Sequence, residues 1–371
     1  MAKTATKDFD GVAAEYLEEN AAYWEERLLK IDEDGYKKAA DFYKELEDVY
    51  KNAEIEIKKQ IEDFYIKFAD ENGIVDLAEA KKILTKGELK EFQWTVEHYV
   101  KECKDLSTSA QQWSQEVKNA SYRYRISRLE ALETQISYQL TLIADKTATG
   151  LTEVLTEIFS DNYYHTAFEV QGAMGLYADF HTLPNESIVK TIKKIWAVDG
   201  SNFSDRIWAN KDKLEKVMHK ELTRQFATGD SMDRAIKTIS KEMNTEKWKA
   251  GRLVSTETAY HQNEARYECF KELGIEEYQY SATLDSRTCK ICGAMDRKVF
   301  KMSDKEVGVN FPILHPNCRC TTLCYTGPLE GKRIARDAND KRIYVDKNMT
   351  YEQWAKEYLK DKPKKSKNNK K

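Results

Sequence analysis

The clearest hydrophobic pattern in the sequence spans residues 36–72, where apolar side chains recur at steps of three and four. A period of 3.6 residues places such side chains on one face of an α-helix. The face comprises Phe42, Leu46, Val49, Ala53, Ile57, Ile61, Phe64 and Phe68. We therefore expect one long helix that ends at Gly73. Packing against other N-terminal helices is favoured over the alternative, a coiled-coil-like surface for a partner.

A shorter helix is expected over residues 9–30, separated from the long one by a turn at residues 32–35. Its apolar residues form a broken stripe among glutamates, and they are Val12, Tyr16, Tyr23, Trp24 and Leu28. Further helices are expected at 77–84, 89–103, 111–147, 151–159, 162–179 and 212–226. Gly150 is expected to end the helix 111–147, and Gly229 the helix 212–226. Only 5 prolines and 15 glycines punctuate the 371 residues, and this favours long helices over a protein with many turns.

One of these helices, 111–147, carries a basic and tyrosine-rich patch. It consists of Tyr122, Arg123, Tyr124, Arg125 and Arg128. Arginines interleaved with tyrosines can bind phosphate and stack on bases. Helical spacing divides this patch over more than one face, however, and Arg125 is followed by Glu130 and Glu133. An ordinary helix in which these glutamates neutralise the arginine is therefore the favoured interpretation.

The last third of the chain changes character. A helix is expected to end at Gly274, and the alternation of residues 277–284 predicts a strand. Five of the seven cysteines then follow within a short region. Cys289 and Cys292 form a Cys-x-x-Cys pair, and a second arm, His-Pro-Asn-Cys-Arg-Cys, begins at His315.

Two close cysteines, a loop, and then histidine and cysteine at close spacing are typical of a zinc site. We expect Cys289, Cys292, His315 and Cys318 to bind one structural zinc ion, with Cys320 as the alternative fourth ligand. Cys324 is expected in the core. The competing interpretation is that the thiols pack without a metal and that His315 only shapes a turn.

Composition narrows the classes of function. Net charge is −3 and charged residues make up 33 %, so the chain as a whole is no general nucleic-acid binder. We expect no secretory signal and no membrane span, because no apolar run approaches the required length. The C-terminal residues 360–371 hold seven lysines and one aspartate and are expected to be disordered. They offer a candidate DNA-binding arm through Lys364, Lys365, Lys367, Lys370 and Lys371.

Three familiar catalytic and phosphate-binding motifs do not occur in the sequence. It contains no phosphate-binding glycine loop, no HExxH and no GxSxG. Glu257 and His261 lie one helical turn apart, but Glu257 is expected to be a buried anchor that bonds the backbone of the cysteine loop. Asp285 is expected to form a turn or to orient a metal ligand, because no βαβ unit follows Cys292 to support redox chemistry.

The residues STETAY, TLDSRTCKICGAMDRKVF and GVNFPILHPNCRC together resemble the phage Mu F-like minor head protein family. The resemblance covers residues 230–325. It implies a minor capsid or head morphogenesis protein of a tailed phage or prophage, made in the bacterial cytoplasm and located in the virion. It also implies action near the portal, with portal and capsid proteins as partners, phage DNA as a further partner and no small-molecule substrate.

The expected fold is mostly α: a long helical N-terminal region, followed by a small α+β module with a Cys/His cluster. The expected domains are 1–183, 200–325 and a C-terminal extension over 326–371. Two alternatives remain beside the head protein. One is a zinc-stabilised DNA-binding protein, and the other is a toxin-related enzyme module.

Overall fold

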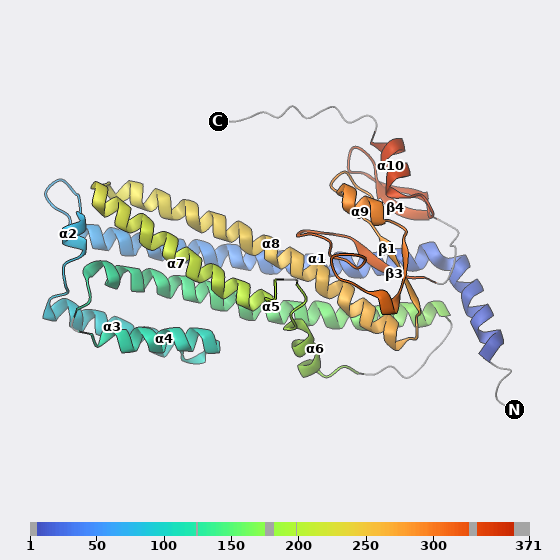
Figure 1. Ribbon diagram of the computed structural model, residues 1–371, viewed down its shortest axis with the longest axis horizontal. Helices are drawn as coiled ribbons and strands as arrows, with labels where there is room; N and C mark the ends of the chain where they lie inside the picture. Colours follow the sequence, from blue (N-terminus) through green and yellow to red (C-terminus); the bar gives the residue numbers. More distant parts are fainter. Residues whose placement is uncertain (1–5, 124, 175–181, 198, 326–331, 360–371) are drawn as a thin grey trace. The chain divides into compact units, whose positions relative to one another are not determined.

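The computed structural model describes residues 6–123, 125–174, 182–197, 199–325 and 332–359, with side chains from Glu26 onward except at 173–174. Helices make up 69 % of the protein, which confirms the expected mostly-α fold with a small sheet region beside a Cys/His cluster. The major helices are α1 (Thr6–Phe68), α3 (Lys86–Glu102), α4 (Thr108–Ser121), α5 (Arg128–Met174), α7 (Phe203–Thr228) and α8 (Met232–Glu272) (Figure 1). Short helices are α2 (Leu77–Ala80), α6 (Asn185–Ile192), α9 (Lys290–Met295) and α10 (Tyr351–Tyr358).

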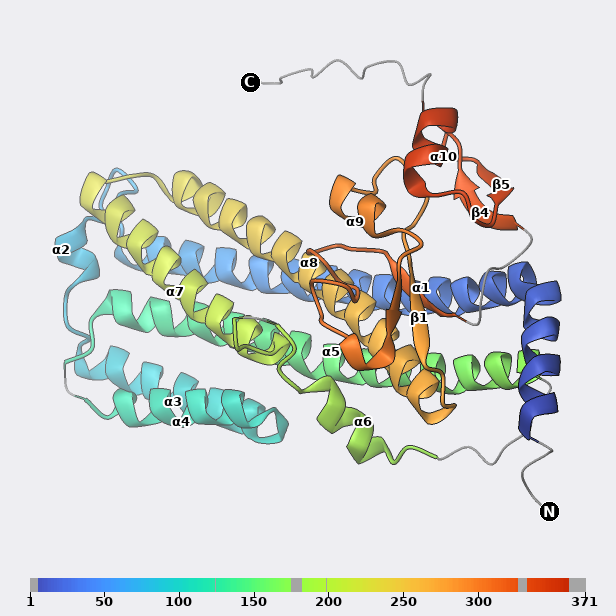
Figure 2. The same cartoon turned by 45° about the vertical axis from the view of Figure 1, so that its right-hand side comes forward.

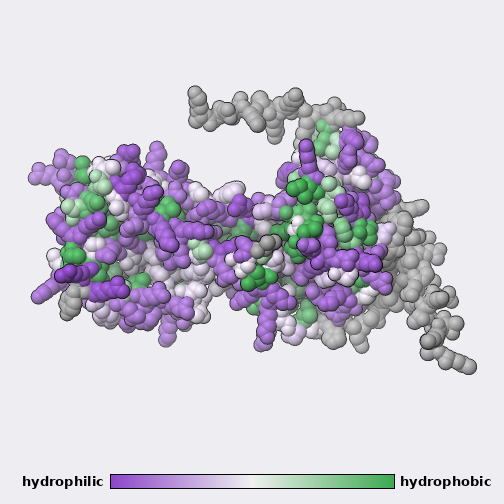
Figure 3. All heavy atoms as spheres, in the orientation of Figure 1, coloured by the Kyte–Doolittle hydropathy of each residue, from purple (hydrophilic) through white to green (hydrophobic). Residues whose placement is uncertain are grey.

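The chain forms two compact units. The helical unit comprises Asp41–Glu153 and Ala197–Val254. The β unit comprises Met1–Ala40, Val154–Trp196 and Ser255–Lys371. The three domains expected from the sequence stay a prediction. On the face shown in Figure 3, hydrophilic residues cover most of the surface. In the described part of the chain, no helix combines the length and apolar character that a membrane crossing requires.

The core of the helical unit contains the predicted apolar face of α1. Ile57 and Ile61 are fully buried, and they share one cluster with residues of α5, α7 and α8. Its members from those helices include Leu132, Ile136, Leu140, Leu214, Met218, Leu222, Ala235, Ile239 and Met243. Each large side chain buried in this way contributes about 1.5–3 kcal/mol. The packing interpretation of the stripe is therefore confirmed.

Two glycines that the sequence presents as breaks lie inside helices. The turn predicted at 32–35 is wrong, because α1 continues through Gly35, and the end predicted at Gly150 is wrong, because α5 continues to Met174. A Cβ on Gly35 would lie 2.2 Å from the Gln262 amide nitrogen, and one on Gly150 would lie 2.5 Å from the Phe42 ring. Close helix packing, rather than a turn, requires glycine at both positions.

The helix predicted over 111–147 is also wrong, because α4 ends at Ser121 and α5 begins at Arg128. Ser127 starts α5 with a capping box. Its hydroxyl accepts from the Glu130 N–H (3.2 Å), and the Glu130 carboxylate accepts from the Ser127 N–H (2.6 Å). Arg123 and Arg125 therefore lie in the linker. The predicted neutralisation of Arg125 is wrong as well, since Glu130 serves the cap and Glu133 pairs with His219.

The β unit holds two small antiparallel sheets. The first has strand order β2–β1–β3, formed by β1 (Glu277–Ser281), β2 (Val299–Lys301) and β3 (Thr321–Cys324). β1 confirms the strand predicted from 277. The second is a hairpin of β4 (Lys332–Arg336) and β5 (Arg342–Asp346), which the sequence analysis did not predict. Both views place it beside α10 (Figure 2), and Leu284, Ala335, Val345 and Trp354 form their shared core.

Candidate metal centre

The first ligand arm is built by a loop and a short helix. Gly274, with φ of 72°, turns the chain out of α8 toward β1, as the sequence predicts. The loop after β1 leads to Cys289, the N-cap of α9, whose sulfur accepts a hydrogen bond from the Cys292 N–H at 3.4 Å. This turn brings the thiols of Cys289 and Cys292 to the same side of the arm.

The second arm is a tight turn tied to α8. The Cys318 N–H donates to the His315 carbonyl at 3.1 Å, and Asn317 adopts a left-handed φ of 58°. Asparagine tolerates this conformation better than most residues, which explains its place in the turn. The Asn317 N–H donates to the Thr256 hydroxyl at 3.1 Å and so anchors the arm on α8.

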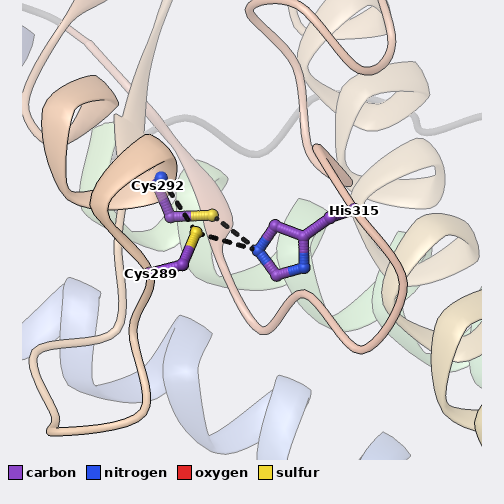
Figure 4. A group of neighbouring side chains, drawn as sticks. All are labelled: Cys289, Cys292 and His315. Carbon is purple, nitrogen blue, oxygen red and sulfur yellow. Dashed lines mark hydrogen bonds between the residues drawn. The ribbon is translucent and has the colours of Figure 1, made fainter.

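The two arms bring five potential ligands together. His315 Nε2 lies 3.3 Å from Cys289 Sγ and 3.1 Å from Cys292 Sγ (Figure 4), while the sulfurs of Cys292 and Cys318 lie 3.7 Å apart. Two groups fulfil metal-site distances, Cys289–Cys292–His315 and Cys292–Cys318–Cys320, each with donor atoms within 4.8 Å of one another. A tetrahedral zinc with ordinary bond lengths separates two sulfurs by about 3.8 Å and a sulfur from a nitrogen by about 3.5 Å. The donor types and spacings therefore fit a metal ion.

The histidine is oriented to offer a lone pair. Its Nδ1 lies 2.9 Å from the Pro316 carbonyl oxygen. Because a carbonyl only accepts, Nδ1 carries the proton in this bond, and Nε2 is left with its lone pair toward the thiols. Such a bond to the remote nitrogen is the usual way in which proteins orient a histidine ligand.

The sequence of this region matches a known family. Residues 216–323 match the family model described as Phage Mu protein F like protein. This segment is Mu F-like. The matched range contains both ligand arms, and it confirms the resemblance seen in the sequence. The matching family is one of structural phage head proteins. Neither the curated proteins nor the solved structures yielded a match.

Asp285 links the two arms of the Mu F-like module. It is 1 % exposed, and its carboxylate receives both terminal nitrogens of Arg319, which stands between Cys318 and Cys320. It also accepts from the N–H groups of Arg287 (2.9 Å) and Thr288 (3.1 Å). Burial opposes ionisation, but the hydrogen bonds and charge of Arg319 lower the pKa of Asp285 to about 2.

Tyr280 of β1 adds a hydroxyl beside the sulfurs. The side chain is fully buried, and its oxygen lies 3.6 Å from Cys292 Sγ and 4.0 Å from Cys318 Sγ. Burial raises the pKa of Tyr280, so the hydroxyl keeps its proton and can donate it to a thiolate. Hydrogen bonds with Cys292 and Cys320 lower the pKa of the Cys318 thiol, whereas hydrogen bonds with Cys318 and Cys320 raise the pKa of Cys292. Without a metal, Cys318 therefore favours the thiolate and Cys292 keeps its proton.

α8 supports the second arm through buried polar side chains. Asn263 donates to the Cys320 carbonyl at 3.1 Å and accepts from the Thr322 N–H at 3.0 Å. Arg266 is fully buried and binds Asp32 of α1 through both terminal nitrogens. Glu257 is also fully buried and accepts from the Trp196 indole N–H at 2.9 Å, while the expected bond to the backbone of the cysteine loop stays a prediction.

A cavity of about 400 Å³ opens beside the ligands. Cys289, Cys292 and His315 contribute to its lining, together with residues such as Thr283 and Arg287. Cys289 is only partly buried, unlike Cys292, Cys318 and Cys320. The centre is therefore open to small solutes from this side, and chelators and metal ions can reach it.

The remaining predicted residues lie outside the cluster. Cys324 is partly buried on β3 and belongs to neither donor group, while Cys103 and Cys269 are buried in the helices. Lys364, Lys365, Lys367, Lys370 and Lys371 lie outside the described residues. The sequence analysis missed Thr256, Asn263, Tyr280 and Arg319 as supporting residues. Only Tyr280 carried a signal, because the alternation of β1 places it on the inner face.

Proposed function

We propose that this protein is a minor structural component of a phage head, that it acts near the portal during assembly, and that one zinc ion holds its Mu F-like module together. The observation that carries this proposal is the family match over 216–323, whose range encloses both ligand arms. A head protein needs a fixed surface more than a reactive one. A metal held between two loops supplies such rigidity where the local apolar core is small.

The proposed ligands are Cys289, Cys292, His315 and Cys318. Cys292 stands in both donor groups, so it is the common point of any four-ligand set. Cys320 is the alternative fourth ligand because it belongs to the group of Cys292 and Cys318. Four protein ligands would close the coordination sphere, and the zinc would therefore be structural.

Elemental analysis of protein purified without chelator tests the metal. We expect about one zinc per chain in the parent and in a Cys324→Ser control, because the two donor groups share Cys292 and can together supply one four-ligand set. The Cys289→Ser, Cys292→Ser double variant should lose the zinc and unfold its module. Zinc well below one equivalent in the parent, together with a double variant as stable as the parent, would rule the site out.

Co-expression with a phage portal protein tests the assembly role. We expect the two proteins to co-purify, and we expect the double cysteine variant to bind less portal because its module is disordered. Failure of the parent to co-purify with either the portal or procapsids would contradict the assembly role while leaving the zinc result intact.

A further inference from the structure

The helical unit contains a cavity of about 480 Å³ between α3, α4, α5 and α7. Its deepest lining is apolar and is formed by Phe92, Ile126, Ile136, Met218 and Leu222, all of them buried. Cavities of this size with an apolar floor and a few polar groups at the rim are the usual binding sites of proteins.

Three cationic side chains stand at the rim of this cavity. Arg123, Arg125 and Lys216 line it, and within the described part of the chain none of the three forms an ion pair. Both arginines and the lysine are exposed. The interleaved arginines that the sequence singled out thus stand free at the mouth of a cavity.

The acidic groups that line the cavity are already bound to other residues. Glu130 serves the capping box of α5, and Glu133 lies 2.6 Å from the ring nitrogen of His219. Glu215 pairs with Lys211 at 2.7 Å. These three carboxylates keep their negative charge, but each is held by a neighbour other than the rim cations. Among the described residues, Arg123, Arg125 and Lys216 therefore have no ion-pair partner and can each pair with an incoming carboxylate.

The positive charge extends along α7. Lys213, Lys216 and Lys220 follow one another at steps of three and four, which places them on one face of the helix. All three are exposed, and neither Lys213 nor Lys220 has an ion pair among the described residues. An extended acidic partner fits this row better than a single small anion does.

The chain itself contains a segment of the complementary kind. Residues 8–26 hold seven carboxylates and no lysine, arginine or histidine. The apolar residues among them are Phe9, Val12, Tyr16, Leu17, Tyr23 and Trp24. The segment belongs to the helix α1.

We propose that residues 8–26 of one copy dock on the cavity of the helical unit of a second copy. The carboxylates would face the rim arginines and the lysine row, and an aromatic side chain would enter the apolar cavity. This is the helix-in-groove mode of recognition. Because two different surfaces of the chain meet, the contact is head to tail and builds a ring or an open chain of copies.

Charge exchange in the full-length protein tests the proposal. The rim variant carries Arg123→Glu, Arg125→Glu and Lys216→Glu. Sedimentation velocity of nuclease-treated protein at low salt should show self-association of the parent that weakens as salt rises. In the rim variant the dissociation constant should rise about tenfold or more, because three attractive charges become repulsive.

The reciprocal charge exchange distinguishes a loss of docking from a loss of folding. The segment variant carries Glu15→Lys, Glu18→Lys and Glu19→Lys, and it should lose self-association in the same way. A mixture of rim variant and segment variant should associate again, because each then supplies what the other lacks. Circular dichroism checks that each variant keeps the helical content of the parent.

A control variant with the same number of reversed charges carries Lys90→Glu, Lys237→Glu and Lys241→Glu. These lysines are exposed in the same unit and do not line the cavity, so this variant should associate like the parent. A parent that stays monomeric, association that disappears on nuclease treatment, or a mixture of the two variants that fails to associate would each overturn the proposal.

Discussion

Replacing Asp285 with asparagine removes one charge from the link between the two ligand arms and changes the side chain's size little. Asp285 is 1 % exposed and binds both terminal nitrogens of Arg319. The amide keeps one acceptor oxygen, but it points an NH2 group at a guanidinium that can only donate. Arg319 therefore loses its charge partner and half of its paired contact.

The pKa of Asp285 gives the size of the effect. A folded-state pKa of about 2, against about 3.9 for an unfolded aspartate, corresponds to about 2.5 kcal/mol of stability. The Arg319 side chain remains 29 % exposed, so solvent screening reduces this. We expect Asp285→Asn to cost about 1–2 kcal/mol at neutral pH. Because the folded-state pKa is lowered, this contribution is complete above about pH 5 and is lost as the pH falls from about 4 toward 2.

Hydrogen exchange followed by mass spectrometry measures this loss where it occurs. In peptides that cover residues 282–289 and 315–321, exchange at neutral pH should become about 5–30-fold faster in the variant. Zinc affinity, measured by competition with a chelator, should fall about tenfold, because the ligand arms lose their link. Asp340→Asn is the matched control, since Asp340 is 68 % exposed and lies 3.9 Å from its arginine partner. If exchange in both arms and zinc affinity match those of the control, Asp285 does not hold the arms together.

Two further predictions concern the core and the C-terminus. Leu222→Ala, in the fully buried core of the helical unit, should lower the free energy of unfolding measured in urea by about 2–5 kcal/mol. Val217→Ala, at a side chain 37 % exposed, should lower it by less than about 1 kcal/mol, and equal losses would contradict the described packing. The full chain should bind a DNA column weakly and without sequence preference, and this binding should fall steeply as salt rises. Removing residues 360–371 should abolish the binding, because seven lysines are removed with them. Unchanged retention on the column would show that the tail is only a solvated end.

The sequence predicted the elements whose signals are local. The apolar face of α1 repeats over many turns, and its members Ile57 and Ile61 are fully buried in the observed core. The Cys/His cluster could be predicted from the sequence for the same reason, since its candidate ligands come in two short segments with fixed internal spacing. The helix ends predicted at glycine were wrong because a glycine can either end a helix or permit close packing within one, and the local sequence does not distinguish the two. Gly35 and Gly150 resemble helix ends in the sequence, and only residues far along the chain, Gln262 and Phe42, show that they permit close packing.

The β4–β5 hairpin shows why a polar stretch can hide a strand. The inward positions of β4 are Arg333 and Ala335, and the first of these reads as a surface residue in any hydrophobicity pattern. Arg333 is 3 % exposed, because Asp296 binds its guanidinium at 2.9 Å and the Ala282 carbonyl accepts from it at the same distance. Asp296 lies 37 positions earlier in the chain, so no local window contains both partners.

The buried carboxylate of Asp296 also links the hairpin to the candidate metal centre. Asp296 also accepts from the N–H groups of Ala282 (2.9 Å) and Tyr351 (2.8 Å), so one buried carboxylate joins the end of β1, the hairpin and α10. Asp285 likewise joins the two ligand arms, because it binds Arg319 of one arm and the backbone N–H groups of Arg287 and Thr288 beside the other. Both aspartates flank the Cys-x-x-Cys pair in the sequence. Their arginine partners indicate that each aspartate joins separate chain segments around the site. Removing Arg333 would leave the buried Asp296 carboxylate without an ion-pair partner among the described residues, whereas Asp285 would keep only the exposed Arg287, at 3.3 Å.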